Sequence, residues 1–237
     1  MSPEHDPADL DARTWGRRAF LGALGAGALA VVAGRPVWNA VSQPLTAVSN
    51  ALPQPVREAL PLDGWRIYAV NPPMPDFDPA TFRLRVTGLV DRELDLSWSD
   101  VQELPRVAQA SDFHCVTGWS VDDVRWEGFR LQALFDRAGL QAAATHLEFV
   151  SLEEPYVDTL SVRQASQADV LVADRMDGHA MPKEHGAPLR LVIPQMYGYK
   201  GVKWLTEVRA TDRPQVGYWE QRGYDTDAWV GRSNGLG

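Results

Sequence analysis

The stretch HCVTGWSVDDVRWEGF, residues 114–129, contains the only cysteine of this 237-residue chain, Cys115. One cysteine excludes a disulfide within the chain. The thiol could be a small buried apolar side chain, which is the commonest fate of a lone cysteine. It could instead be a nucleophile paired with a base such as His114, or a soft metal ligand. A single thiolate holds a metal poorly, so in the third case a cofactor must supply the other ligands. The residues alone leave all three roles open.

A second segment, HGAPLRLVIPQMYGYKGVKWL at residues 185–205, is basic although the chain is acidic. It combines a histidine and three cationic side chains with three glycines: His185, Arg190, Lys200, Lys203, Gly186, Gly198 and Gly201. Glycines let backbone N–H groups approach an anion closely, while lysine and arginine supply charge. The pattern predicts a phosphate or pyrophosphate site, although it has neither the Walker spacing nor G-x-G-x-x-G. The alternative is a solvated basic hairpin between two strands.

The composition limits the class of protein. With 45% hydrophobic and 23% charged residues, the chain is globular and long enough to bury one sizeable core. Its formal net charge of -8 argues against a nucleic-acid binder, because binding to the phosphate backbone requires a basic surface. Any anion site must therefore be local.

The N-terminal segment has the form of an export signal. Arg17 and Arg18 come directly before a run without charged side chains, residues 19–34. The order Arg-Arg-x-Phe-Leu resembles the twin-arginine export signal, although Gly16 and Gly22 depart from its usual residues. We expect residues 1–34 to be a signal or an uncleaved membrane anchor; a buried or interfacial helix is the alternative.

The remainder of the chain is predicted to consist of a linker and one folded domain. Residues 35–62 are rich in Pro, Ser and Ala without sustained periodicity, which is typical of a linker. We expect residues 63–237 to form a single domain. An export signal places that domain in the periplasm or another extracytoplasmic compartment.

Hydrophobic periodicity indicates the main elements. Apolar and polar residues alternate along TFRLRVTGLV, residues 81–90, which predicts a half-buried strand. LDLSWSDVQELP predicts a strand that leads into a helix capped by Ser99 and ended by Pro105. RLQALFDRAGL has helical spacing and ends at Gly139.

Five further segments are typical of strands: HLEFVSL, YVDTLSV, DVLVAD, LRLVIP and KWLTEVRA, which begin at residues 146, 156, 169, 189 and 203. Strands outnumber helices and the connections are long and irregular. The sequence therefore predicts a mixed α+β fold.

The two quoted segments, in this order, resemble the molybdopterin-binding domain of the sulfite oxidase superfamily. The likeness extends from about Trp65 to Tyr224 and includes GYWEQRGYD after the second segment. It is similar to the small bacterial members, among them the catalytic subunit of the periplasmic methionine-sulfoxide reductase. The resemblance implies a mixed-sheet, sulfite-oxidase-type molybdopterin-binding fold in a single domain.

By this resemblance Cys115 gives its thiolate to molybdenum and is the catalytic residue. The further cofactor contacts that the resemblance implies are Arg66, Tyr68, His114, Ser151, His185, Arg190, Lys200, Gly201, Val202 and Lys203. Gly201, Val202 and Lys203 match a loop that holds the pterin phosphate. For Arg66 and Tyr68 a plain strand is the alternative, and His114 either orients the site or faces the core. Trp119 and Trp126 are expected to form walls of the pocket.

The resemblance implies an oxidoreductase that transfers an oxygen atom to or from a small sulfur-containing or N-oxide substrate. Electrons would pass to or from an external partner, either a membrane haem or quinone protein or a soluble cytochrome. The sequence has no C-x-x-C-H, so no haem is expected. A short single-domain chain favours the reductase direction, with oxidation of sulfite as the alternative.

Two other classes are also consistent with the residues. A thiol hydrolase would pair Cys115 with one of the histidines: His114, His146, His179 or His185. A binding module without catalysis would leave the thiol inert and the basic segment without a ligand. Molybdenum content distinguishes these classes from the oxidoreductase.

Overall fold

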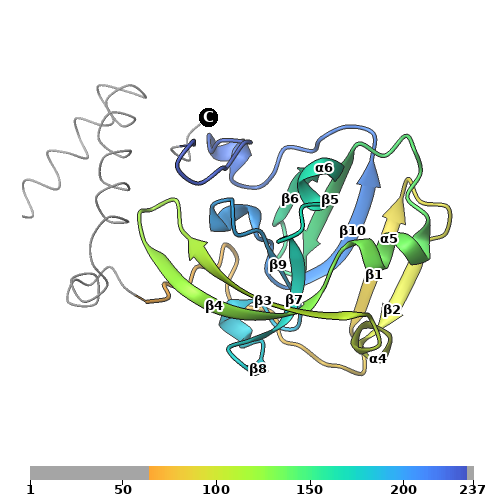
Figure 1. Cartoon of the computed structure of the whole chain (residues 1–237), viewed down its shortest axis with the longest axis horizontal. Coiled ribbons are helices and arrows are strands. Elements are labelled where there is room, and N and C mark those ends of the chain that lie inside the picture. The colour runs from red at the N-terminus through yellow and green to blue at the C-terminus, as the bar shows by residue number, and fades with distance from the viewer. Residues whose placement is uncertain (1–63, 234–237) are drawn as a thin grey trace, which may run out of the picture. The chain divides into compact units, whose positions relative to one another are not determined.

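The computed structural model describes residues 64–233, which contain two β-sheets and a few short helices (Figure 1). The first sheet has the order β2-β1-β10-β5-β6. Its strands are β1 (Arg83–Gly88), β2 (Leu94–Ser97), β5 (His146–Ser151), β6 (Val157–Ser161) and β10 (Leu205–Thr211). β1 and β10 run parallel and the other neighbours antiparallel, so the sheet is mixed.

The second sheet is antiparallel and has the order β3-β4-β7-β8, with β9 paired to β7. Its strands are β3 (Arg106–His114), β4 (Ser120–Phe129), β7 (Leu171–Met176), β8 (His179–Ala180) and β9 (Arg190–Val192). β7 pairs only with the second half of β4, from Trp126 on. The β3–β4 hairpin therefore extends beyond β7 and carries its turn, with Cys115, away from the sheet (Figure 1).

The helices are short and lie between strands. The α-helices are α4 (Trp98–Gln102), α5 (Gln132–Ala138) and α6 (Val162–Ala165). The 3-10 turns are η1 (Lys183–His185), η2 (Gly198–Lys200) and η3 (Glu220–Arg222). None of the helices in residues 64–233 is long and apolar enough to cross a membrane.

The main core lies against the mixed sheet. Leu84 and Val86 of β1 are fully buried, as are Leu147 and Phe149 of β5 and Val208 of β10. Each such side chain contributes about 1.5–3 kcal/mol relative to an exposed position. A smaller apolar cluster joins β4 to β7 through Val124, Trp126, Leu171, Ala173 and Met176. Each of the two sheets therefore packs against a cluster of buried apolar side chains.

Most of the predicted elements are confirmed. The alternating stretch forms β1, with Arg83 and Arg85 exposed, and the helix predicted at 130–140 is α5, which ends at Gly139 with φ +73°. The other predicted strands correspond to β2, β5, β6, β7, β9 and β10. The α+β class and the mixed sheet are therefore as expected.

The predicted helix cap at Ser99 is wrong. α4 begins at Trp98 and its N-cap is Ser97, whose hydroxyl accepts from the Asp100 N–H at 3.3 Å. The Asp100 carboxylate accepts from the Ser97 N–H at 2.8 Å, which completes a capping box. Asp100 stands three residues after Ser97, and that spacing decides where the helix begins.

The basic segment at 185–205 is not a solvated hairpin. β9 pairs with β7 in the antiparallel sheet, whereas β10 pairs with β1 and β5 in the mixed sheet. The segment therefore crosses from one sheet to the other, and its Arg190 and Lys200 are buried.

The predicted signal at 1–34 and linker at 35–62 lie outside the described residues. Residues 64–233 belong to one compact unit. The domain boundaries remain predictions.

Candidate active site

One cavity, of about 180 Å³, brings together segments that are far apart in the sequence. Its walls come from the stretch before β1, the β3–β4 turn, the end of β5, the basic segment and the stretch after β10. These contribute residues within the ranges 65–70, 113–119, 151–156, 184–203 and 219–224. Both motifs of the sequence therefore meet at one cavity.

Cys115 lies in the turn of the β3–β4 hairpin and lines this cavity. Its N–H donates to the Trp119 carbonyl at 2.9 Å, and the Gly118 N–H donates to the Cys115 carbonyl at 3.0 Å. Gly118 has φ +91°, a conformation that favours glycine. The sulfur lies 3.2 Å from the Thr117 hydroxyl, and Cys115 is half-buried. The thiol is thus held at the cavity wall and is not sealed in the core.

Arg190 of β9 places a buried guanidinium at the same cavity. It is 4% exposed and donates to the His185 carbonyl at 3.2 Å. It also lies over the rings of Phe113 (4.8 Å), Trp126 (5.6 Å) and Trp65 (5.7 Å). Burial lowers the pKa of Arg190 to about 10, so it is still charged at neutral pH. Within residues 64–233 no carboxylate forms an ion pair with it.

Lys203 brings a second cation to this wall. Its ammonium donates to the Tyr68 carbonyl at 2.5 Å and to the Glu184 carbonyl at 3.3 Å, and lies 4.2 Å from the Trp204 ring centre. Burial, and then the charge of Arg190, lower the pKa of Lys203 to about 8. In the described part of the chain Lys203 has no ion pair with a carboxylate. Two cations that repel each other thus share one wall.

His185 lies at this wall as a neutral ring. Burial, and then the charge of Arg190, lower the pKa of His185 to about 4. Its ring packs against Trp65 with centroids 4.6 Å apart. At neutral pH His185 therefore adds no charge to the cavity.

Most of the site residues expected from the sequence line the cavity. These are Arg66, Tyr68, Cys115, Ser151, His185, Arg190, Gly201 and Lys203. Ser151 uses its hydroxyl within the protein: it donates to the Lys203 carbonyl at 2.8 Å and accepts from the Glu153 N–H at 2.9 Å. Ser151 therefore supports the backbone that carries Lys203.

The structure does not bring Lys200 to the cavity with the other expected site residues. Its ammonium forms ion pairs with Asp158 and Glu220, and Lys200 is 1% exposed and not part of the cavity wall. The motif could not predict these ion pairs, because Asp158 and Glu220 lie far from Lys200 in the sequence.

Val202 and His114 also lie outside the main cavity wall. Val202 is fully buried, and its N–H donates to the Lys200 carbonyl at 3.1 Å, so it does not offer this group to a ligand. His114 bonds to the Ser120 hydroxyl across the hairpin at 2.9 Å. It lines a small adjoining cavity of about 10 Å³, and burial lowers its pKa. Both residues are therefore part of the support behind the site.

The cavity also has walls to which sequence reasoning gave no role. Tyr156, Trp219 and Tyr224 line it, the last two from the stretch after β10. Burial raises the pKa of Tyr224, and the nearby Cys115 adds to the effect. Tyr224 therefore keeps its proton beside the sulfur. The motif GYWEQRGYD contains both residues and was the only signal for them.

The residues fit a sulfur-ligated, anionic metal cofactor. Cys115 supplies one soft ligand, while residues 64–233 contain no cluster of three side chains able to hold a metal ion. The remaining metal ligands would come from the cofactor. Among residues 64–233, Arg190 and Lys203 lack an ion pair with a carboxylate, and the buried indole N–H of Trp119 has no acceptor. An anion with acceptor oxygens would compensate all three groups.

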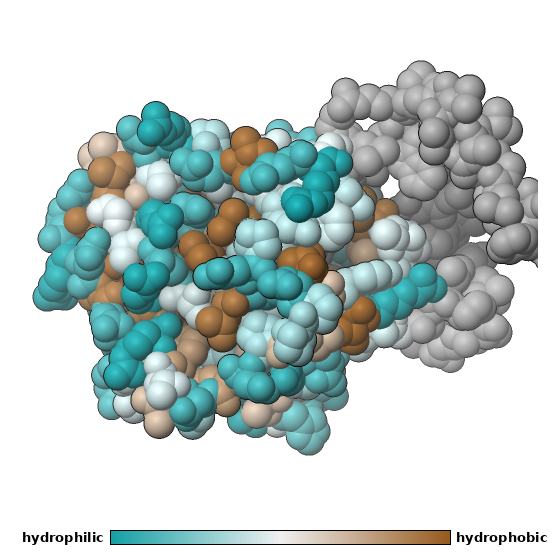
Figure 2. Space-filling view, turned by 180° about the vertical axis from the view of Figure 1, so that it is seen from behind, coloured by the Kyte–Doolittle hydropathy of each residue, from teal (hydrophilic) through white to brown (hydrophobic). Residues whose placement is uncertain are grey.

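Two exposed hydrophobic side chains line the cavity. Among residues 64–233 the exposed large hydrophobic side chains are Ile67, Tyr68, Leu152 and Val216, and Ile67 and Tyr68 line the cavity. On the face seen in Figure 2, hydrophobic residues form small patches separated by hydrophilic ones.

Comparison with known proteins identifies relatives of this arrangement. A family model described as "Oxidoreductase molybdopterin binding domain" matches residues 71–219. An uncharacterized oxidoreductase of Bacillus subtilis, YuiH, is 36% identical over 154 residues, which is 64% of this chain and 77% of that protein. The methionine-sulfoxide reductase catalytic subunit of Gluconobacter oxydans is 31% identical, covering 61% of this chain and 52% of that subunit.

Two further relatives are larger proteins. Human mitochondrial sulfite oxidase is 30% identical over 181 residues, covering 64% of this chain and 33% of that enzyme. The chain therefore spans about half of the reductase subunit and a third of the sulfite oxidase. The crystal structure of sulfane dehydrogenase SoxCD from Paracoccus pantotrophus matches with a TM-score of 0.55 at 22% identity, covering 60% of this chain and 41% of that chain. This match shows the fold.

These findings confirm the predicted family and fold, and they contradict the alternative of a non-catalytic module. The chain belongs to the oxidoreductase molybdopterin-binding domain family and is an enzyme.

Proposed function

We propose that this protein is an exported molybdenum-cofactor oxidoreductase that removes an oxygen atom from a small sulfoxide or N-oxide, with electrons from an external partner. The observation that carries the proposal is the shared cavity: Cys115 lines the same 180 Å³ space as Arg190 and Lys203, which have no carboxylate partner in residues 64–233. Methionine-sulfoxide reductase subunits among the relatives support the reductase direction.

The cofactor would be held at two ends. Cys115 would provide the thiolate for the metal, while Lys203 and Arg190 would bind the anionic end. Gly201 also lines the cavity, but its N–H donates to the Gly198 carbonyl at 3.1 Å. The bound cofactor supplies the two-electron redox chemistry and the oxygen-atom transfer. The Thr117 hydroxyl, 3.2 Å from the sulfur, would hold and tune the ligand.

The substrate end of the cavity favours a neutral substrate with one polar oxygen. Many of its other walls are aromatic and include Trp65, Trp119, Trp219 and Tyr224, while Glu153 and Glu184 also line the cavity. Apart from Arg66, the cationic side chains that line it are those assigned to the cofactor. Aromatic walls exclude water, and the protonated Tyr224 can donate a hydrogen bond to a sulfoxide or N-oxide oxygen.

The decisive experiment measures metal and turnover on protein purified with its cofactor. We expect molybdenum with an electron paramagnetic resonance signal, and reduction of methionine sulfoxide or trimethylamine N-oxide by reduced benzyl viologen. Cys115→Ser should lose both the signal and the activity. A molybdenum-replete Cys115→Ala protein would contradict the ligand assignment, and iodoacetamide-sensitive hydrolase activity without metal would replace the oxidoreductase by a thiol hydrolase.

Oxidation of sulfite is the second candidate, because human sulfite oxidase is 30% identical and Arg66 lines the cavity. It predicts reduction of ferricyanide or cytochrome c on addition of sulfite. If sulfite is oxidised with a higher kcat/KM than that for any sulfoxide or N-oxide reduced, the proposed direction is wrong.

The export route rests on Arg17 and Arg18, which lie outside the described residues. Changing both to lysine should leave the protein in the cytoplasm, as measured by cell fractionation of the native host. Export of the double variant at the wild-type level would contradict the twin-arginine route.

A further inference from the structure

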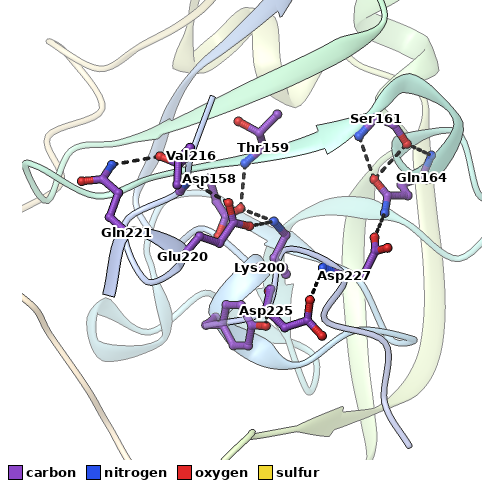
Figure 3. Close-up of polar contacts among 12 residues, drawn as sticks. Asp158, Thr159, Ser161, Gln164, Lys200, Val216, Glu220, Gln221, Asp225 and Asp227 are labelled. Atoms are coloured by element: carbon purple, nitrogen blue, oxygen red, sulfur yellow. Dashed lines mark hydrogen bonds and ion pairs between the residues drawn. The ribbon is translucent and has the colours of Figure 1, made fainter. Parts of the chain in front are cut away.

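A buried cluster of three charges lies behind the cavity. The Lys200 ammonium contacts the carboxylates of Asp158, at 2.5 Å, and of Glu220 (Figure 3). Their side chains are 1%, 1% and 3% exposed, respectively. Such a cluster is a poor source of stability, because desolvation of the three charges opposes their attraction. Its position in the fold suggests a different use.

Glu220 holds the stretch that follows β10. One carboxylate oxygen contacts Lys200, and the other accepts from the Gly217 N–H at 2.8 Å. Asp158 packs closely against this stretch: a Cβ atom added at Gly217 would lie 3.0 Å from the Asp158 carboxyl group. The Tyr218 N–H also donates to the Val157 carbonyl at 2.9 Å. The cluster thus fixes the start of the stretch on β6.

The same stretch carries two walls of the cavity, one on each side of Glu220. Trp219 and Tyr224 both line the cavity, their ring centroids are 5.0 Å apart, and the Tyr224 N–H donates to the Trp219 carbonyl at 3.1 Å. Displacement of Glu220 would therefore move both rings.

Lys200 also connects the stretch to the basic segment. Its neighbours Tyr199 and Gly201 line the cavity. The Tyr199 hydroxyl donates to the Asp225 carbonyl at 2.6 Å, and the Tyr199 ring is 5.3 Å from that of Tyr224. The cluster joins the part of the site assigned to the cofactor to the part assigned to the substrate.

We propose that Asp158, Lys200 and Glu220 are positioning residues: their buried ion cluster holds the stretch 217–224 so that Trp219 and Tyr224 close the cavity beside Cys115. The consequence for turnover rests on the proposed function, whereas the positioning itself can be measured without turnover.

The cluster has an excess of negative charge, which makes the positioning depend on pH. Burial, together with the charge of Glu220 and against that of Lys200, raises the pKa of Asp158 to about 6. The Thr159 N–H bonds to Asp158, and the phenols of Tyr156 and Tyr199 also interact with it. Both phenols stay protonated, because burial raises their pKa. Asp158 is therefore the group whose raised pKa makes the cluster respond to pH.

The sign of the pH effect follows from the raised pKa. A carboxyl group whose folded pKa is raised stabilises the closed stretch when protonated, and this stabilisation is lost as pH rises from about 4 to about 6. As Asp158 loses its proton, its charge is repelled by that of Glu220, so the stretch opens more readily. Asp158→Asn should remove this dependence.

The test uses the full chain with its cofactor and three variants. Glu220→Gln removes the charge that holds the stretch, Asp158→Asn keeps the Lys200–Glu220 pair, and Glu148→Gln is the control. Glu148 is another buried carboxylate with an ion pair, to Arg209, on the mixed sheet. Hydrogen exchange of residues 217–224, corrected for the intrinsic rate, reports opening of the stretch independently of activity.

We expect Glu220→Gln to speed exchange in 217–224 by about tenfold or more, with exchange in β3 and β4 unchanged. Its kcat should fall by about ten- to a hundredfold at the same molybdenum content. The wild type should show faster opening as pH rises from 4 to 6, and Asp158→Asn should stay slow throughout. Glu148→Gln should match the wild type in 217–224.

Unchanged exchange in Glu220→Gln, or the same pH profile in wild type and Asp158→Asn, would overturn the positioning. If Glu220→Gln does not fold, the profile of Asp158→Asn still decides the question. Fast exchange in Glu220→Gln, in a protein whose wild type reduces neither a sulfoxide nor an N-oxide, would retain the positioning and remove the proposed function.

Discussion

Lys200 and Lys203 are three residues apart in one motif, yet their surroundings are opposite. Lys200 contacts two carboxylates, and their charges raise its pKa although burial alone would lower it. Lys203 contacts carbonyl oxygens and an aromatic ring, and burial lowers its pKa to about 8. The charge of Lys200 is compensated by two carboxylates, whereas that of Lys203 has no carboxylate partner in the described part of the chain. The comparison shows that the neighbours of a basic residue, more than its motif, decide what it binds.

The largest effect is expected from Lys200→Met. This change leaves Asp158 and Glu220 buried together without a cation, which costs about 3–5 kcal/mol. The melting temperature should fall by roughly 10 °C, as measured by thermal denaturation followed by circular dichroism. A melting temperature equal to that of the wild type would mean that Lys200 does not stabilise the fold, contrary to the role given to it in the comparison with Lys203.

Lys203→Met should lower cofactor binding and leave the stability of the fold intact, the opposite of Lys200→Met. Loss of a charged contact to the anionic end of the cofactor should lower molybdenum occupancy by about tenfold, as measured by elemental analysis. The cofactor-free protein should be as stable as the wild type or more so, because a cation near Arg190 is removed. Full molybdenum occupancy in Lys203→Met would show that Lys203 does not bind the cofactor, and the contrast with Lys200 would not hold.

The two lysines should also differ in their response to pH. The pKa of Lys203 is about 8 in the folded chain and 10.5 in the absence of perturbation, so the folded chain loses this proton first. The cofactor-free protein should therefore gain stability as pH rises from 8 towards 10.5. Cofactor loading should fall severalfold between pH 7 and 9.

The matched control for this response is Lys203→Met. Its loading and its stability should both be independent of pH over this range. A wild-type loading curve that is flat through pH 8 would show that the charge of Lys203 does not contribute to binding.

The smallest effect is expected at Lys183, a third lysine just before the motif. It forms an ion pair with Asp76 at the surface, where both side chains are largely exposed. Such pairs contribute at most about 1 kcal/mol. Lys183→Met should change neither melting temperature nor molybdenum occupancy measurably, and a loss of occupancy would extend the anion site beyond Lys203.

The sequence predicted those parts of the fold that depend on local pattern. The alternation at Leu84 and Val86 led to β1, and the glycine at 139 marked the end of α5, because each signal lies within one element. β3 and β4 were not predicted. Their residues alternate weakly, since much of the hairpin is exposed on both faces, and its pairing depends on distant β7.

The candidate site was likewise predictable where the signal lay within one motif. Cys115, Arg190 and Lys203 were selected from two motifs and line one cavity. The ion pairs of Lys200 could not be predicted, because Asp158 and Glu220 are 42 and 20 residues away in sequence and no local pattern pairs them with it. The walls formed by Trp219 and Tyr224 depend on the same long-range contacts.

The crossover of the basic segment from β9 to β10 has a mechanical consequence. Arg190 belongs to the antiparallel sheet and Lys203 precedes a strand of the mixed sheet, while Cys115 stands at the tip of a hairpin. A ligand bound by all three would connect these parts of the fold. Once bound, it adds its binding free energy to the barrier against unfolding, and the loaded protein should resist proteolysis far longer than the empty one.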